Sequence, residues 1–199
     1  MTSILPDRAD LLDTVTFATG AHDANGDAMC VMECVSYITG EPWSDRPQCV
    51  SPVIAAFLRS WNDALPEPPR TALLRPLVPL VIGTRTTEAD EHTRAWMATD
   101  WLVRVNAPAW MDLTPALAPH ATALRRLPPL TSSEMATEFQ SAIASAWDAA
   151  SDAAAAAAAD AAWYAAWDAA MAPIVSTLQL SAVELVKTMC AVGRDEQRA

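Results

Sequence analysis

Apolar side chains recur every three or four residues along most of the chain, which is the spacing of one face of an α-helix. Between Ala28 and Thr39 this face carries Met32, Val35 and Ile38, and Gly40 follows as a residue suited to end a helix. No segment shows the alternation of apolar and polar residues that is typical of a half-buried strand. The pattern therefore predicts an all-α fold, a globular bundle of several helices.

Caps and prolines divide the next hundred residues into pieces. Ser51 and Pro52 form an N-cap and a first helical position, so a helix is expected to follow. Prolines interrupt the apolar run 73–82, which predicts a short or kinked buried helix. Thr87 and Asp90 resemble a capping box that opens a helix reaching Val105. Further prolines punctuate 108–129 and leave one short helix around 120–127.

The C-terminal third differs in composition, because 19 of the 31 residues from 142 to 172 are alanine. Alanine has the highest helix propensity, so we expect a long alanine-rich helix or a helical hairpin. Pro173 implies one kinked helix or two helices that meet there. Two apolar stripes follow helical spacing along this third of the chain: Phe139, Ile143, Trp147 and Ala150, then Trp163, Trp167, Met171, Ile174, Leu178, Ala182, Leu185 and Met189.

Charge supports a division of the chain into a helical core, 1–130, with an irregular start at 1–27, and an acidic helical arm, 131–199. The formal net charge is -11. Between Arg126 and Lys187 there is no basic residue, so this segment contributes -7 through its seven acids, Glu134, Glu138, Asp148, Asp152, Asp160, Asp168 and Glu184. We expect the arm to pack on the core or to extend from it, within one cooperative domain.

Composition also limits the classes of function. With 24 acidic against 13 basic residues, the chain is unsuited to direct binding of nucleic acid, which requires a basic surface. The longest uncharged stretch, 169–183, is shorter than the roughly 20 apolar residues of a membrane helix. Met1–Leu12 has no features of a signal peptide. These observations predict a cytoplasmic protein with no membrane association.

Reactive side chains are densest between His22 and Asp63. Glu33 shares a helix face with two cysteines, and a hairpin with the following helix would bring it toward Arg59. A carboxylate between thiols and a guanidinium is typical of a general base, a metal ligand or a paired buried charge. The candidate catalytic residues are Glu33, Asp45, Cys49, Arg59 and Asp63.

The cysteines and a nearby histidine offer the right number of ligands for zinc: His22, Cys30, Cys34 and Cys49. Their spacing does not match the usual two-residue knuckle, and a buried cysteine on a helix more often acts as a small hydrophobic residue. We therefore predict no cofactor, with zinc as the alternative. Elsewhere, Asp100 and Arg104 have the spacing of an ordinary helical ion pair, which we favour over a catalytic arrangement with His92.

The block CVMECVSYITGEPWSDRPQCVSPVIAAFLRSWNDALP, Cys30–Pro66, resembles one that recurs in proteins of high-GC bacteria and their bacteriophages. Thr93–Leu113 and the alanine- and tryptophan-rich C-terminal segment are similar to the same group. The resemblance carries no established activity. It implies a phage or accessory-gene setting, in the host cytoplasm or a virion, and a recurring core of Glu33, Trp43, Asp45, Cys49, Arg59, Asn62 and Asp63.

Two hypotheses about function follow. The first is a non-enzymatic α-helical interaction or assembly protein, which self-associates or binds a basic protein partner. Its contact residues would be Asp148, Asp152, Asp160, Trp163, Trp167 and Asp168. The alternative is a metal- or thiol-dependent hydrolase that uses Cys30, Glu33, Cys34 and Cys49.

Overall fold

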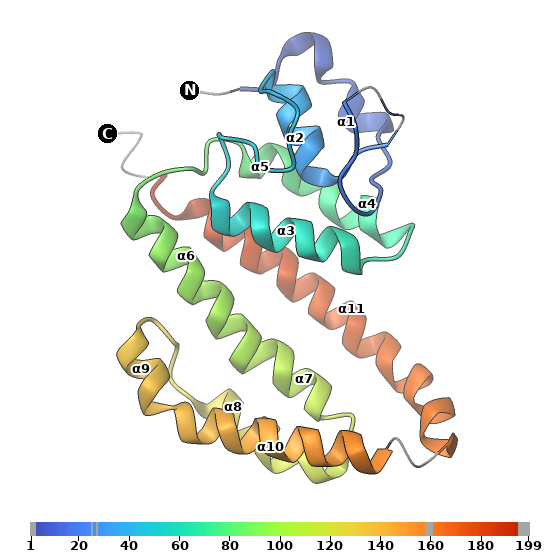
Figure 1. The fold of residues 1–199 in the computed structure, drawn as a ribbon, viewed down its shortest axis with the longest axis vertical. Coiled ribbons are helices and arrows are strands. Elements are labelled where there is room, and N and C mark those ends of the chain that lie inside the picture. The colour runs from blue at the N-terminus through green and yellow to red at the C-terminus, as the bar shows by residue number, and fades with distance from the viewer. Residues whose placement is uncertain (1–2, 25, 27, 158–160, 195–199) are drawn as a thin grey trace. The chain divides into compact units, whose positions relative to one another are not determined.

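The structure is a computed structural model, and helices joined by irregular segments make up the part of the chain that it describes (Figure 1). It describes residues 3–24, 26, 28–157 and 161–194, with the backbone alone for 154–157 and 161–170. These residues contain no strand, and their one β-bridge joins Phe17 to Met29. The predicted all-α fold is confirmed.

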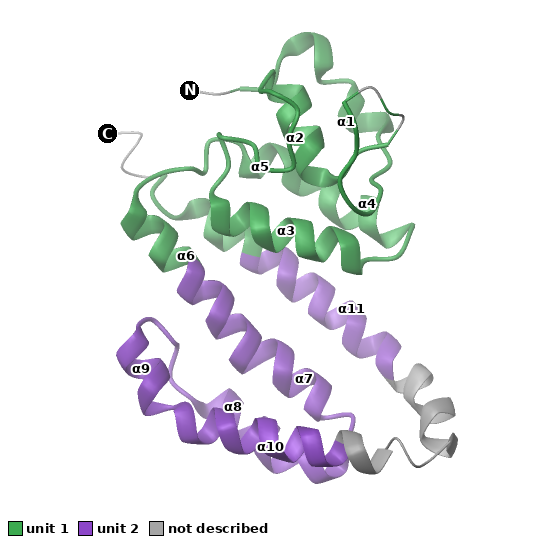
Figure 2. Cartoon of the chain, viewed as in Figure 1, with its two compact units in different colours: residues 1–94, 186–199 green, residues 95–185 purple. Residues whose placement is uncertain are grey.

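The chain forms two compact units (Figure 2). Unit 1 contains residues 1–94 and 186–199, and unit 2 contains residues 95–185. The division predicted at residue 130 is therefore not the one observed, because the expected arm is shared between the units. The last part of the arm belongs to unit 1 through Arg94, which is fully buried and donates to the carbonyl oxygens of Met189, at 3.1 Å, and Val192, at 2.8 Å.

Unit 1 consists of short helices joined by irregular segments. Its elements are η1 (Pro6–Arg8), α1 (Leu11–Thr14), α2 (Val31–Thr39), α3 (Pro52–Ala64), α4 (Pro69–Leu74), η2 (Arg75–Leu77), α5 (Val78–Val81), the start of α6 (Glu88–Trp101) and the end of α11 (Ala161–Ala191). Three predicted local signals are confirmed: Gly40 ends α2 with φ 75°, Ser51 accepts from Ile54 N, and Thr87 and Asp90 bond reciprocally.

Helix α2 begins three residues later than predicted. Met29 pairs with the segment before it, since Ala18 N donates to Met29 O at 2.9 Å, and this pairing holds the backbone extended up to Cys30. The helix is also buried on almost every side, and only Tyr37 is exposed. The polar and apolar faces predicted for α2 are thus both inside unit 1.

Unit 2 is built around the rest of α6 and the helices that follow it. Its further elements are η3 (Leu102–Asn106), α7 (Ala107–Met111), η4 (Pro115–Leu117), α8 (Ala118–Arg126), α9 (Ser133–Glu138) and α10 (Gln140–Ala157), with the larger part of α11. η3 is a π-helical segment, so the helix predicted to run to Val105 changes its hydrogen bonding after Trp101. The ion pair predicted between Asp100 and Arg104 is confirmed, with two contacts of 2.6 and 2.8 Å.

Alanine residues lie where two helices of unit 2 pack against each other. Helices α8 and α10 run side by side (Figure 1), and Ala146, 2% exposed, lies in a core cluster with Met111, Leu117, Ala121 and Leu124. Ile143 and Ala150 pack against this cluster, but Trp147 does not, since it is 74% exposed. Phe139 is the C-cap of α9 and lies outside α10, and the step of four from Ile143 to Trp147 turns about 40° around α10.

Helix α11 continues through Pro173 and does not divide there. Leu178, Ala182, Leu185 and Met189 of the longer stripe are buried, while the side chains of Trp163 and Trp167 lie outside the described residues. By length and composition, one segment of the described chain is apolar enough to cross a membrane, Met171–Ala191, with mean hydropathy 1.3 and 28% burial. The core helix of a globular protein passes the same test of length and composition, so the absence of a membrane segment stays a prediction.

Candidate functional site

Glu33 is the most buried of the candidate catalytic residues, with 1% exposure. Its Oε1 accepts from the backbone N–H of His22 at 2.7 Å. Its Oε2 accepts from Cys30 N at 2.7 Å and lies 2.8 Å from His22 Nδ1. Of the three roles that the sequence left open, Glu33 therefore has the arrangement of a paired buried charge.

The electrostatics of Glu33 follow from these contacts. Burial alone would raise its pKa, but the backbone bonds from Cys30 and His22 and the His22 ring outweigh burial, so the pKa lies below its ordinary value. Glu33 is the third residue of α2, and its carboxylate turns back to the N-cap to complete a capping box with Cys30. The carboxylate is ionised at neutral pH, and each of its oxygens accepts a hydrogen bond from a backbone N–H group, that of His22 or that of Cys30.

No hydrogen bond or ion pair joins Glu33 to Arg59, and the approach of the two side chains stays a prediction. Arg59 Nη1 donates to Asp45 O at 3.0 Å, and its Nε lies 3.4 Å from Asp45 Oδ2. Since the capping box turns Glu33 toward the N-terminal end of α2, the guanidinium pairs with the loop that follows α2.

The cysteine thiols are buried and hold their protons. Burial, with a smaller contribution from the Glu33 carboxylate, raises the pKa of Cys30 to about 12. Burial likewise raises the pKa of Cys34 to about 12. For Cys49, burial and the carboxylate of Glu41 together raise the pKa to about 11. A thiol acts as a nucleophile or metal ligand only when it is deprotonated, so these pKa values oppose both roles at neutral pH.

Cys49 also lies apart from the other candidates. Its backbone N–H donates to Glu41 Oε1 at 2.8 Å. Cys49 is also absent from the lining of the pocket, described next, that contains Asp45 and Arg59. Among the residues the structure describes, no three histidine, cysteine, aspartate or glutamate side chains form a group that could hold a metal ion. The suggested zinc set of His22, Cys30, Cys34 and Cys49 is thus not assembled there.

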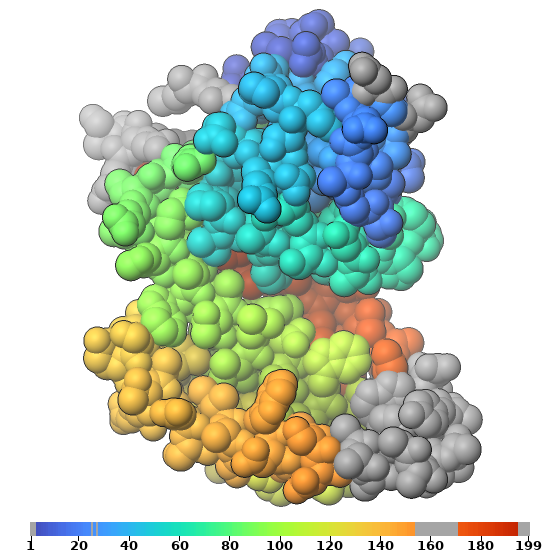
Figure 3. All heavy atoms as spheres, in the orientation of Figure 1, coloured from blue at the N-terminus to red at the C-terminus, as the bar shows by residue number. Residues whose placement is uncertain are grey.

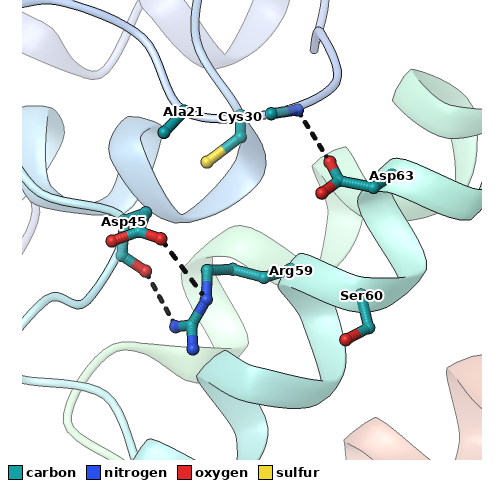
Figure 4. Close-up of a pocket in the computed structure, with 7 residues that line it drawn as sticks. Ala21, Cys30, Asp45, Arg59, Ser60 and Asp63 are labelled. Carbon is teal, nitrogen blue, oxygen red and sulfur yellow. Dashed lines mark hydrogen bonds and ion pairs between the residues drawn. The ribbon is translucent and has the colours of Figure 1, made fainter.

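Three of the candidates, Asp45, Arg59 and Asp63, line one pocket in unit 1 (Figure 4). Its volume is about 260 Å³. One wall is the surface of α3, and another comes from the loop before α2, the N-cap of α2 and the loop after it. The lining residues are Gly20, Ala21, Cys30, Asp45, Arg59, Ser60 and Asp63.

Asp63 is held in place at this pocket by its neighbours. Its Oδ1 accepts from Gly20 N at 2.8 Å and from Asn62 Nδ2 at 3.0 Å. Asn62 is itself fully buried, and its Nδ2 also donates to Ala18 O at 2.8 Å. The bond from Gly20 is the largest cause that lowers the pKa of Asp63, so this carboxylate is ionised at neutral pH.

The sequence analysis missed three pocket residues, Gly20, Ala21 and Ser60. Ser60 lies between Arg59 and Asp63 on α3, so its helical position alone was a usable signal. Gly20 and Ala21 carry no comparable signal, because their position depends on how the N-terminal loop folds over α3.

The residues predicted to bind a partner lie in the C-terminal third. Asp148 and Asp152 are exposed on α10. Asp160 and the side chains of Trp163, Trp167 and Asp168 lie outside the described residues. The exposed aromatic residue that the structure does place beside these aspartates is Trp147, a member of the apolar stripe that begins at Phe139.

Comparisons with known proteins found no family model, no curated protein and no solved structure that matches this chain. The resemblance of the block 30–66 to proteins of high-GC bacteria and their phages stays a prediction.

Proposed function

We propose that the protein is a non-enzymatic interaction protein that binds a basic protein partner through an exposed surface of α10. This surface, called here the α10 face, consists of Trp147, Asp148 and Asp152. The observation that carries the proposal is the 74% exposure of Trp147. A large aromatic side chain that is exposed to this extent is typical of an interaction site. Tryptophan is enriched among the residues that contribute most of the binding energy at such sites.

The α10 face stands on a packed base. The opposite side of the helix, with Ile143, Ala146, Ala149, Ala150 and Ala153, lies against the core cluster of unit 2. In the space-filling view, side chains of α10 (orange) lie uncovered on the face shown (Figure 3). A surface residue on a helix fixed by its other side loses little entropy when a partner binds, which favours affinity.

Charge decides which kind of partner fits. Asp148 and Asp152 are one helical turn apart and both exposed. A second copy of the same face would bring carboxylates against carboxylates, because a two-fold interface places one patch against itself. A partner with arginine or lysine side chains complements the aspartates, and its cations can also stack on the Trp147 ring.

The hydrolase alternative has less support. It requires a thiolate or a metal ligand set, whereas the pKa values of Cys30, Cys34 and Cys49 are raised to between about 11 and 12. It also requires a base that is free to accept a proton, and Glu33 is occupied by two backbone N–H groups and His22.

The test is binding of the full chain to a helical peptide that presents arginines every four residues, measured by biolayer interferometry at two salt concentrations. We expect Trp147→Ala, and separately the double variant Asp148→Asn/Asp152→Asn, to weaken binding by about tenfold or more. The matched control is Glu134→Gln/Glu138→Gln, which removes the same charge from exposed positions of α9.

Equal losses in the two double variants would contradict the proposal, since binding would then follow net charge and not the α10 face. Light scattering gives an independent check. A dimer of the wild-type chain that Trp147→Ala converts to a monomer would also overturn the proposal, in favour of self-association.

A further inference from the structure

The pocket lined by Asp45, Arg59 and Asp63 contains one ionised group that forms no ion pair within the described residues, Asp63, although the Arg70 guanidinium is close enough to help lower its pKa. Asp63 uses Oδ1 for the bonds from Gly20 and Asn62, and Oδ2 forms no hydrogen bond or ion pair with the described part of the chain. Figure 4 shows the two oxygens of Asp63, one bonded to the loop above it and the other unbonded. The carboxylate is thus fixed in position with one acceptor atom unused.

The other charges of the pocket neutralise each other. Arg59 is tied to Asp45 by its Nε, at 3.4 Å from the carboxylate, and by its Nη1, which donates to the Asp45 carbonyl. With this pair balanced, the formal charge of the lining is that of Asp63 alone, -1. An anionic ligand would compete with Asp45 for the guanidinium and meet Asp63 as a like charge. The complement of this pocket is a single cation.

The remaining lining suits a short, narrow ligand. The pocket volume of about 260 Å³ is below the usual range of about 300 to 1,000 Å³ for sites that bind drug-sized molecules. The methyl group of Ala21 and the protonated thiol of Cys30 offer weakly polar contacts, and the Ser60 hydroxyl can donate or accept a hydrogen bond. The methylene groups of Arg59 extend this surface beneath the guanidinium.

We propose that this pocket binds a primary ammonium group on a short aliphatic stem, with the ammonium donating to Asp63 Oδ2 and the stem lying against Ala21, Cys30 and Arg59. A primary ammonium has three N–H donors and a compact charge, so it fits one carboxylate oxygen and a hydroxyl together. This site lies in unit 1 and is independent of the α10 face. The same group occurs on free small amines and on lysine side chains.

The experiment is a titration of the full-length chain with butylammonium, followed by two-dimensional amide NMR. The reporter is the Gly20 N–H, because it donates to the carboxylate that would receive the ligand. We expect saturable shifts of Gly20 and Ser60 with a dissociation constant on the order of millimolar, typical of a single exposed ion pair with limited burial. Butanol and butyrate, which have a similar stem, are expected to produce no saturable shift.

Three variants separate the site from general charge effects. Asp63→Asn keeps an acceptor for Gly20 and is expected to weaken butylammonium binding about tenfold. Ser60→Arg places a cation at the rim and is expected to weaken binding without altering the fold, since Ser60 is exposed. Arg59→Gln leaves Asp45 with Arg46 alone, at 3.8 Å, and is expected to tighten binding several-fold, because the residues that line the pocket then carry a charge of -2.

Asp13→Asn is the control, since Asp13 is exposed, lies in α1 and does not line the pocket. Equal weakening in Asp13→Asn and Asp63→Asn would overturn the proposal, as would unchanged binding in Ser60→Arg. Nα-acetyl-lysine methylamide distinguishes the sources of the ammonium. Tighter binding than butylammonium assigns the site to a lysine side chain, and weaker binding assigns it to a free amine.

Discussion

The two units are stabilised in different ways. In unit 1, irregular segments are held by buried polar side chains: Glu33 accepts from two backbone N–H groups, and Arg94 donates to two carbonyl groups. In unit 2, α8 and α10 are held by apolar contacts between small residues such as Ala121 and Ala146. A buried polar group leaves its partners unsatisfied when it is removed, whereas an alanine contact is sensitive mainly to added volume.

The contrast explains an imbalance in the composition. The chain has twelve arginines and one lysine among its 13 basic residues. Many of these arginines donate to backbone carbonyl groups in unit 1, including Arg70 to Asn62 O at 2.8 Å and Arg194 to Ile82 O at 3.2 Å. A guanidinium has five donors in a fixed fork, so it can bridge several carbonyls that a lysine ammonium would reach only singly.

The largest effect is expected at Arg94. Arg94→Met leaves the Met189 and Val192 carbonyls without the arginine donor and leaves Glu91 without its ion pair, so the free energy of unfolding should fall by about 3 to 5 kcal/mol. Urea denaturation measures the change. Arg126→Met is the control, because Arg126 is exposed and should leave the midpoint unchanged. A small effect at Arg94 would remove the distinction between the two units.

A smaller loss is expected at Glu33. Glu33→Gln keeps the shape but places an amide NH2 against groups that are themselves donors, so unfolding should require about 2 kcal/mol less. The matched control is Glu138→Gln at an exposed position of α9. Hydrogen exchange would show the reason, since the amides of His22 and Cys30 should lose protection first. Retained protection at both amides would contradict the role assigned to Glu33.

Acid should weaken unit 1 through the same carboxylates. The pKa of Glu33 and that of Asp63 are lower in the folded chain than their ordinary values of 4.5 and 3.8. Both groups therefore stabilise the fold fully above about pH 4.5, and this contribution is lost as the pH falls through their folded values. Unfolding midpoints between pH 7 and pH 3 should fall less steeply in Glu33→Gln than in the wild-type chain. Parallel profiles would exclude Glu33 as a source of the dependence.

The smallest effect is expected in unit 2. Ala146→Leu adds volume where α10 meets the core cluster, which should lower stability by about 1 kcal/mol. Ala144→Leu makes the same change at an exposed position of α10 and should have no measurable effect on the denaturation midpoint. A stabilising Ala146→Leu would show that this contact is loosely packed and would weaken the contrast with unit 1.

Local signals were sufficient to predict most of the secondary structure. Gly40 ends a helix, Ser51 begins one, and the prolines of 73–82 break one, because each acts on the backbone within a few residues of itself. Helical spacing also placed Leu178, Ala182 and Leu185 on one helix face, and all three are buried. It did not distinguish Trp147 from Ile143 and Ala150 of the same stripe, although Trp147 is exposed and the other two pack on the core cluster.

The candidate site was predicted only in part. The sequence alone brought Asp45, Arg59 and Asp63 together as candidates, because they are close along the chain and of the right chemical types. Their pairing was decided by the tertiary structure: Glu33 turned to His22 and Cys30, and Arg59 to Asp45.

By itself, the sequence determined an all-α chain, its caps and breaks, and the acidic, alanine-rich character of its C-terminal third. Only the tertiary structure decided that this third belongs to two units, with Arg94 holding the end of α11 to the start of α6. Propensity and capping depend on neighbours along the chain, which the sequence states directly. The partner of a buried charge depends on which distant backbone groups lack a hydrogen bond, and that is fixed only when the helices have packed.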